Sequence, residues 1–213
     1  MNSGLRSDTP NPKSIVEGMT LLACGRAEGI QRFGARVDNL LAALAPGLAM
    51  CIVGLLTVAL QKQPVLGMVR VELSFCTLLA LPVFSHFFAK KWRREELWLR
   101  YATAAIWCEW VTVFVSVAAL AMGSVMFSSI SGNAGFGTAV VLTSDIYGLW
   151  LGTFVAKVGL RISWPKAILL YGSTFCFALV CYYLASQFSP HYNFISDLLQ
   201  PGFTSGAGDS SDS

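Results

Sequence analysis

Two acidic residues lie deep within long apolar stretches of this sequence. Glu109 and Asp145 each stand in a segment that is otherwise apolar enough to cross a membrane. An ionised side chain at the bilayer centre costs about 2.5–3.5 kcal/mol on insertion scales, so an acid in such a position raises the hypothesis of a functional role. Glu109, Thr112 and Ser116 are spaced i, i+3, i+7, which places them on one face of a helix. Together with Asp145, these three side chains are our candidates for a proton or ion path.

Asp145 has small companions on its own helical face. Thr138, Gly148 and Gly152 share that face. Gly148-x-x-x-Gly152 is a small-xxx-small motif, which lets two membrane helices approach closely because neither residue carries a bulky side chain. We therefore predict that Gly148 and Gly152 are helix-packing positions.

Both carboxylates are expected near the middle of the membrane. Glu109 follows Arg100 by nine residues and Asp145 precedes Lys157 by twelve, which corresponds to about 13 and 18 Å from one boundary. No Lys or Arg lies at a matching depth to pair with them. The acids therefore either form a proton or cation path, or are protonated groups that hydrogen-bond to neighbouring helices and fix their packing.

The sequence shows no motif of an enzyme, a nucleotide-binding protein or a metal site. Its six cysteines include no CxxC pair and no zinc-type Cys–His spacing. The glycine-rich residues 128–137 lack the context of a phosphate-binding loop, and His86 and His191 are predicted at opposite faces of the membrane. We expect no catalysis, no cofactor and no metal. The cysteines inside apolar runs, interpreted as small buried side chains, are Cys51, Cys76, Cys108 and Cys176.

Composition places the chain in a membrane. Of its 213 residues, 54% are hydrophobic and only 13% are charged. A soluble domain carries about 25% charged residues, which it needs to cover its surface. The net charge of +3 is too small to indicate a nucleic-acid partner.

We predict an all-α fold, a polytopic bundle of five transmembrane helices. Each predicted span has roughly the 20 residues that cross a hydrocarbon core of about 30 Å. No cleavable signal peptide is apparent, so the first span is expected to act as the membrane signal. The spans are residues 40–60, 65–89, 97–125, 136–156 and 167–188.

The distribution of Lys and Arg predicts the orientation of this bundle. With the N-terminus in the cytoplasm and the C-terminus outside, thirteen basic residues lie on the cytoplasmic side and two, Lys62 and Arg70, on the other. Adding or removing one span would put adjacent basic segments on opposite faces. Lys90, Lys91, Arg93 and Arg94 form the densest basic loop, which either only determines the topology or also contacts anionic lipid head groups.

The segments outside the spans are of two kinds. Residues 1–13 and 189–213 are expected to be disordered tails because they are polar and rich in Gly, Ser and Pro. Residues 14–38 carry apolar side chains at helical spacing, interrupted by charges. They are predicted to form one or two amphipathic helices that either lie on the cytoplasmic membrane surface or pack on the cytoplasmic ends of the bundle.

This plan resembles the Yip1 superfamily, and in particular small alphaproteobacterial membrane proteins that are loosely Yip1-like. The similar stretches are IVEGMTLLACGRAEGIQRF at residues 15–33, before the first span, and YGLWLGTFVAKVGLRISWPKA at residues 147–167, which joins the last two spans. The resemblance implies a bacterial inner-membrane location and no known catalytic residues. Eukaryotic members act in membrane traffic with small GTPases, but no element of this sequence specifies such a partner.

The sequence therefore favours a non-catalytic membrane protein that acts as a scaffold or accessory factor, with lipid and a membrane-protein partner or a second copy as its contacts. The alternative is a small proton- or ion-coupled permease, and a membrane enzyme of unrecognised type is a third hypothesis. Exchanging Glu109 for Gln or Asp145 for Asn should abolish permease function but spare a scaffold. A scaffold should instead lose function on Gly148→Leu or on deletion of residues 14–38.

Overall fold

The computed structural model describes residues 12–60, 64–126 and 134–188, and these are helical apart from short turns, with no strand among them. Five of its helices are long and apolar enough to cross a membrane. This confirms the predicted all-α class and the predicted number of apolar helices. They are α2 (Val37–Ala59), α3 (Pro64–Lys91), α4 (Glu95–Met126), α5 (Ala134–Leu160) and α6 (Trp164–Phe188).

The turns between the helices are shorter than predicted. Lys90 and Lys91 finish α3, and Glu95 and Glu96 begin α4, so only residues 92–94 lie between the two helices. Basic residues at a helix C-terminus and acidic residues at an N-terminus both interact favourably with the helix dipole, which explains why these charges extend the helices. In the same way α5 continues to Leu160 and includes Lys157 in its last turn.

Several sequence predictions fall on residues outside the described ranges. The expected tails correspond to residues 1–11 and 189–213, and most of the expected loop at residues 128–137 also lies outside the description. The described part differs from these expectations at two points. Pro12 and Lys13 belong to a helix, and residues 134–137 form the first turn of α5.

The N-terminal segment forms a compact cap on the bundle. It consists of α1 (Pro12–Ala23) and the 3-10 helix η1 (Ala27–Arg32), and both contact α4 and α5. Leu22 and Phe33 are buried in the main core, so the apolar face of this segment is turned towards the other helices. The Tyr147 hydroxyl of α5 donates a hydrogen bond to the Ala23 carbonyl, with an O–O distance of 3.0 Å.

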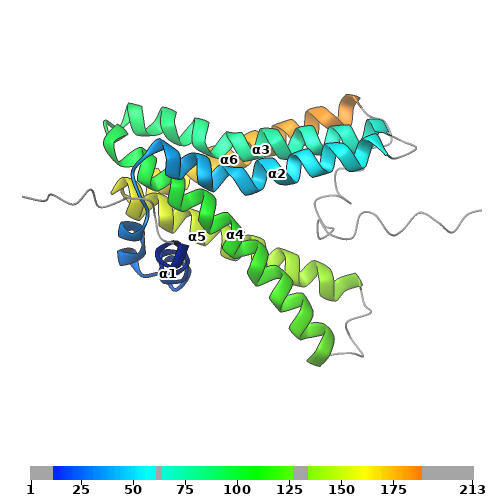
Figure 1. Cartoon of the computed structure of the whole chain (residues 1–213), viewed down its shortest axis with the longest axis horizontal. Coiled ribbons are helices and arrows are strands. Elements are labelled where there is room, and N and C mark those ends of the chain that lie inside the picture. The colour runs from blue at the N-terminus through cyan, green and yellow to red at the C-terminus, as the bar shows by residue number, and fades with distance from the viewer. Residues whose placement is uncertain (1–11, 61–63, 127–133, 189–213) are drawn as a thin grey trace, which may run out of the picture.

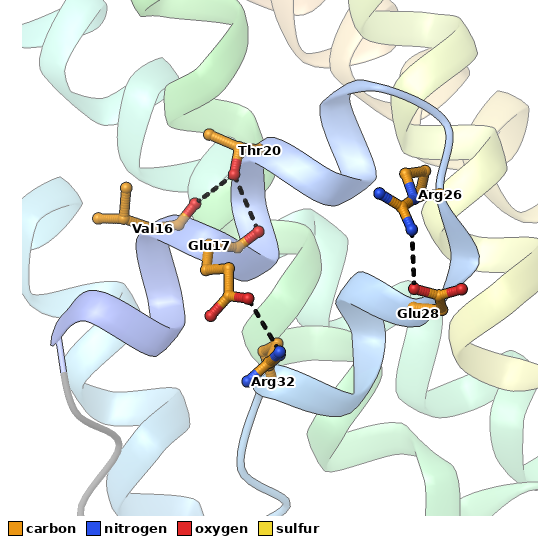
Figure 2. A network of polar contacts seen from close by, with 6 residues as sticks. All are labelled: Val16, Glu17, Thr20, Arg26, Glu28 and Arg32. Carbon is orange, nitrogen blue, oxygen red and sulfur yellow. Dashed lines mark hydrogen bonds and ion pairs between the residues drawn. The ribbon is translucent and has the colours of Figure 1, made fainter.

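Polar contacts hold the two parts of the cap together (Figure 2). The Arg32 guanidinium pairs with the Glu17 carboxylate at 2.8 Å, which joins η1 to α1. Gly18 and Gly29 lie against each other where a side chain on either would not fit. The chain turns between the two helices at Gly25, whose φ of 75° is the left-handed conformation that glycine adopts without strain.

The buried core lies at the end of the bundle where α4 begins. Residues 101–106 of α4 are all buried, because α1, α2, α3 and α5 pack around this part of the helix. The helices α2, α3 and α6 run side by side, whereas the paired helices α4 and α5 diverge from them towards Met126 and Ala134 (Figure 1). Glu109 and Asp145 lie beyond the continuously buried residues at the start of α4.

Candidate functional site: an intramembrane carboxylate face

Three glycine contacts set the register of α4 against α5. A Cβ on any of these glycines would press on a side chain of the other helix, so the backbones approach closely there. In this antiparallel register, residue 109 lies level with about residue 151, and residue 145 with about residue 115. The contacts join Gly148 to Thr112, Gly159 to Tyr101 and Gly123 to Phe136.

The register separates the two carboxylates along the axis of the α4–α5 pair. On α4, the level of Asp145 is six residues beyond Glu109, which corresponds to about 9 Å along the helix. Ser116 lies near the level of Asp145, but its hydroxyl donates to the Thr112 carbonyl at 2.9 Å and is thus engaged within its own helix. The predicted candidates therefore occupy one region of the α4–α5 pair but do not converge on one point.

Both carboxylates nevertheless point to the same side of the α4–α5 pair. At 100° per residue, Asp145 lies close to the direction of Gly152, and Gly152 is in contact with Tyr171 of α6. On α4, the angular position of Glu109 relative to Thr112 and Tyr101, which face α5, also places its side chain on the α6 side. Gly148 and Gly152 thus serve two different neighbours, because Gly148 faces Thr112 of α4 and Gly152 faces α6.

Glu109 and Asp145 are both exposed on the surface of the described chain. No residue that the structure describes donates a hydrogen bond to either carboxylate or forms an ion pair with it. The described helices therefore do not separate these two carboxylates from the membrane. The group that balances them must be water, lipid, a segment outside the described residues or another polypeptide.

Two tyrosines that the sequence analysis missed lie near Glu109. Tyr101 and Tyr171 are both within electrostatic range of Glu109, and Cys108 adjoins it on α4. The Tyr101 hydroxyl is fully buried and has no hydrogen-bond partner among the described residues. Tyr101 precedes Glu109 by eight residues, a spacing that could have drawn attention to it. Tyr171 could not have been found, since its position depends on how α6 packs on α5.

The predicted lipid-contact residues gather at the other end of these helices, near the buried core. The Lys166 ammonium lies 5.8 Å from the ring centroid of Trp92, which brings the α5–α6 turn next to the α3–α4 turn. Trp98 donates from Nε1 to the Ser85 hydroxyl at 3.0 Å, and its ring meets the His86 ring edge-on. His86 thus packs on an aromatic side chain at this end of α3.

Within the described ranges, no three His, Cys, Asp or Glu side chains lie close enough to hold a metal ion. The six cysteines are free thiols. Of the four cysteines predicted to be buried, only Cys108 is buried. Cys51 and Cys76 are half-buried, and Cys176 is exposed on a face of α6 that no described segment covers. The chain matches no family model, no curated protein and no solved structure.

Proposed function

We propose that this chain is a non-catalytic membrane protein that acts as a scaffold or accessory subunit for another membrane protein. One observation carries the proposal: Glu109 and Asp145 are exposed at the surface of apolar helices and have no partner in the described chain. A polar group that faces lipid is costly, and contact with another transmembrane segment removes that cost. The carboxylate face of α4 and α5 would then be the docking surface.

The arrangement of the helices supports this proposal. The outer parts of α4 and α5 diverge from α2, α3 and α6, so they lack the packing that surrounds the first half of α4 (Figure 1). Membrane helices associate through close packing and interhelical hydrogen bonds. A partner helix beside α4 and α5 would supply both, since it would cover their apolar side chains and hydrogen-bond to the two acids.

The proposed setting is the inner membrane of a bacterium, with the N-terminus in the cytoplasm and the C-terminus outside. The strong excess of Lys and Arg at the ends of α3 and α5 and in the turns that follow these two helices supports this orientation. Kinship with the Yip1 superfamily remains a proposal that rests on the two sequence stretches quoted above.

A small proton or cation permease is the second candidate function. The observation in its favour is the position of Tyr101 and Tyr171 within electrostatic range of Glu109, because hydroxyl and carboxyl groups together can relay a proton. In that case, water and not protein would reach Glu109, and Asp145 would extend the path about 9 Å towards the opposite face.

Isosteric exchanges distinguish the two functions. Glu109→Gln and Asp145→Asn keep the size of each side chain and one acceptor oxygen but remove its titratable group. For an accessory subunit, we expect both variants to recover the membrane partner at near wild-type yield after gentle-detergent purification from native membranes. We also expect liposomes that contain the purified wild-type protein to show no proton flux above empty liposomes.

The matched control is Thr143→Ser, which changes an exposed hydroxyl residue of α5 that donates to its own helix. The proposal would be contradicted by a wild-type preparation without any stoichiometric partner whose liposomes conduct protons. Loss of that flux in Glu109→Gln but not in Thr143→Ser would then establish the permease function.

A further inference from the structure

Basic side chains form ion pairs in one part of the described chain and not in another. The three ion pairs found within the described ranges all involve arginines of the N-terminal segment. The basic residues of the α3–α4 and α5–α6 turns form no ion pair with any described residue. We call them the two-turn basic cluster: Lys90, Lys91, Arg93, Arg94, Lys157, Arg161 and Lys166.

Aromatic rings hold two members of this cluster in place. The Lys157 ammonium lies 4.5 Å from the centroid of the Trp164 ring, and Lys166 lies over Trp92 across the two turns. Tryptophan favours the head-group level of a membrane because its ring is apolar and its N–H is polar. In a membrane-spanning bundle, these contacts would hold cationic groups at the level of the lipid phosphates.

Each turn also places an arginine in a position that suits glycine. Arg93 has a φ of 56° and Arg161 a φ of 53°, both in the left-handed region. The surrounding hydrogen bonds are those that end a helix with a left-handed residue: Arg94 N–H donates to the Ala89 carbonyl at 2.8 Å, and Ile162 N–H to the Lys157 carbonyl at 3.1 Å. Glycine would adopt this conformation without strain, so the arginines cost stability in the folded chain.

We propose that the two-turn basic cluster binds the phosphate group of an anionic phospholipid. Arg93 and Arg161 would contact the phosphate as charge-assisted hydrogen-bond donors, and the ring-held lysines would add to the positive field. Exposed apolar side chains continue from both turns towards the membrane interior, and they offer a surface for the acyl chains that a free phosphate would not use. They are Val83 and Phe87 on α3 and Ile168 and Leu169 on α6.

The test uses a substitution that removes charge without harming the fold. In the variant Arg93→Gly/Arg161→Gly, we expect the thermal unfolding midpoint in neutral detergent to stay constant or rise by about 2–4 °C, because strain is relieved. Binding of phosphatidylglycerol, measured by native mass spectrometry and by titration in phosphatidylcholine nanodiscs, should weaken about fivefold for each arginine removed. Unimpaired stability excludes misfolding as the cause of weaker binding.

The matched control removes two arginines that already have carboxylate partners, in Arg26→Ala/Arg36→Ala. This variant loses the same formal charge and should bind phosphatidylglycerol like the wild type. Millimolar inorganic phosphate or glycerophosphoglycerol should not displace the lipid. The proposal is overturned if the glycine variant binds as tightly as the wild type, if the control loses as much affinity, or if soluble phosphate competes fully.

Discussion

Replacing Tyr101 by alanine should lower the free energy of unfolding by about 3–5 kcal/mol, the usual cost of truncating a large aromatic side chain in a packed core. Tyr101 is 0% exposed, and its ring covers Gly159 of α5 in the part of α4 that other helices enclose. Truncation to alanine leaves a cavity in this packing, and the surrounding helices relax into it only partially. Unfolding of the purified protein by an ionic detergent, followed by circular dichroism, measures the change.

Tyr101→Phe is the matched control, since it keeps the ring and removes only the hydroxyl. That hydroxyl is buried without a hydrogen-bond partner among the described residues, so its loss should leave stability unchanged or slightly higher. If Tyr101→Phe destabilised the protein as much as Tyr101→Ala, the hydroxyl would have an essential partner, and the packing of α4 on α5 would not be what holds the residue.

The second large loss of stability is expected for Gly152→Ala, a substitution that adds a single carbon. A Cβ there would overlap the Tyr171 ring and lie 2.7 Å from its hydroxyl oxygen, so α5 and α6 would have to separate or the ring would have to move. Overpacking of this kind costs about 1–3 kcal/mol. We therefore expect Gly152→Ala to lower the unfolding midpoint, although alanine is the better helix former.

Gly172 on the neighbouring helix offers a control with the opposite expected sign. A Cβ at Gly172 meets nothing within 4 Å, so Gly172→Ala should be neutral or should stabilise α6 by up to about 1 kcal/mol. In a Tyr171→Ala background the penalty of Gly152→Ala should disappear, which a double-mutant cycle detects. Equal effects of alanine at positions 152 and 172 would show that α5 does not approach α6 at Gly152.

The sequence was sufficient to predict the helices because the membrane restricts the choice. An apolar run of about 20 residues has few alternatives to a helix, since each unpaired backbone group in lipid is costly. The ends of the helices were less predictable. Lys90, Lys91 and Lys157 looked like loop residues, yet they extend their helices because a positive charge at a helix C-terminus is favourable.

The candidate site was only partly predictable, because the sequence does not show the register of α5 against α4. Spacing within one helix placed Glu109 with Thr112, but it could not show which level of α5 lies beside them. The glycine contacts supply that information and separate Glu109 from Asp145 by about 9 Å. The motif formed by Gly148 and Gly152 predicted close approach to one helix, whereas its two glycines face two different helices.

The arrangement of the helices suits the binding of a partner protein. The cap and the enclosed first half of α4 form a closely packed core at one end of the bundle, near the two-turn basic cluster. The outer parts of α4 and α5 project from this core (Figure 1). Glu109 and Asp145 are exposed beyond the enclosed part of α4. A face that is packed against the core at one end and uncovered beyond it suits a docking surface within the membrane.

The most direct test of the proposed docking surface is site-specific photocrosslinking in native membranes. Val113 and Leu149 follow Glu109 and Asp145 by one helical turn and therefore share their face, whereas Phe114 and Ile146 are exposed on other sides of α4 and α5. With p-benzoylphenylalanine at positions 113 and 149, we expect one discrete adduct with another polypeptide, and none at positions 114 and 146. Lipid adducts alone, in equal yield at all four positions, would contradict the account.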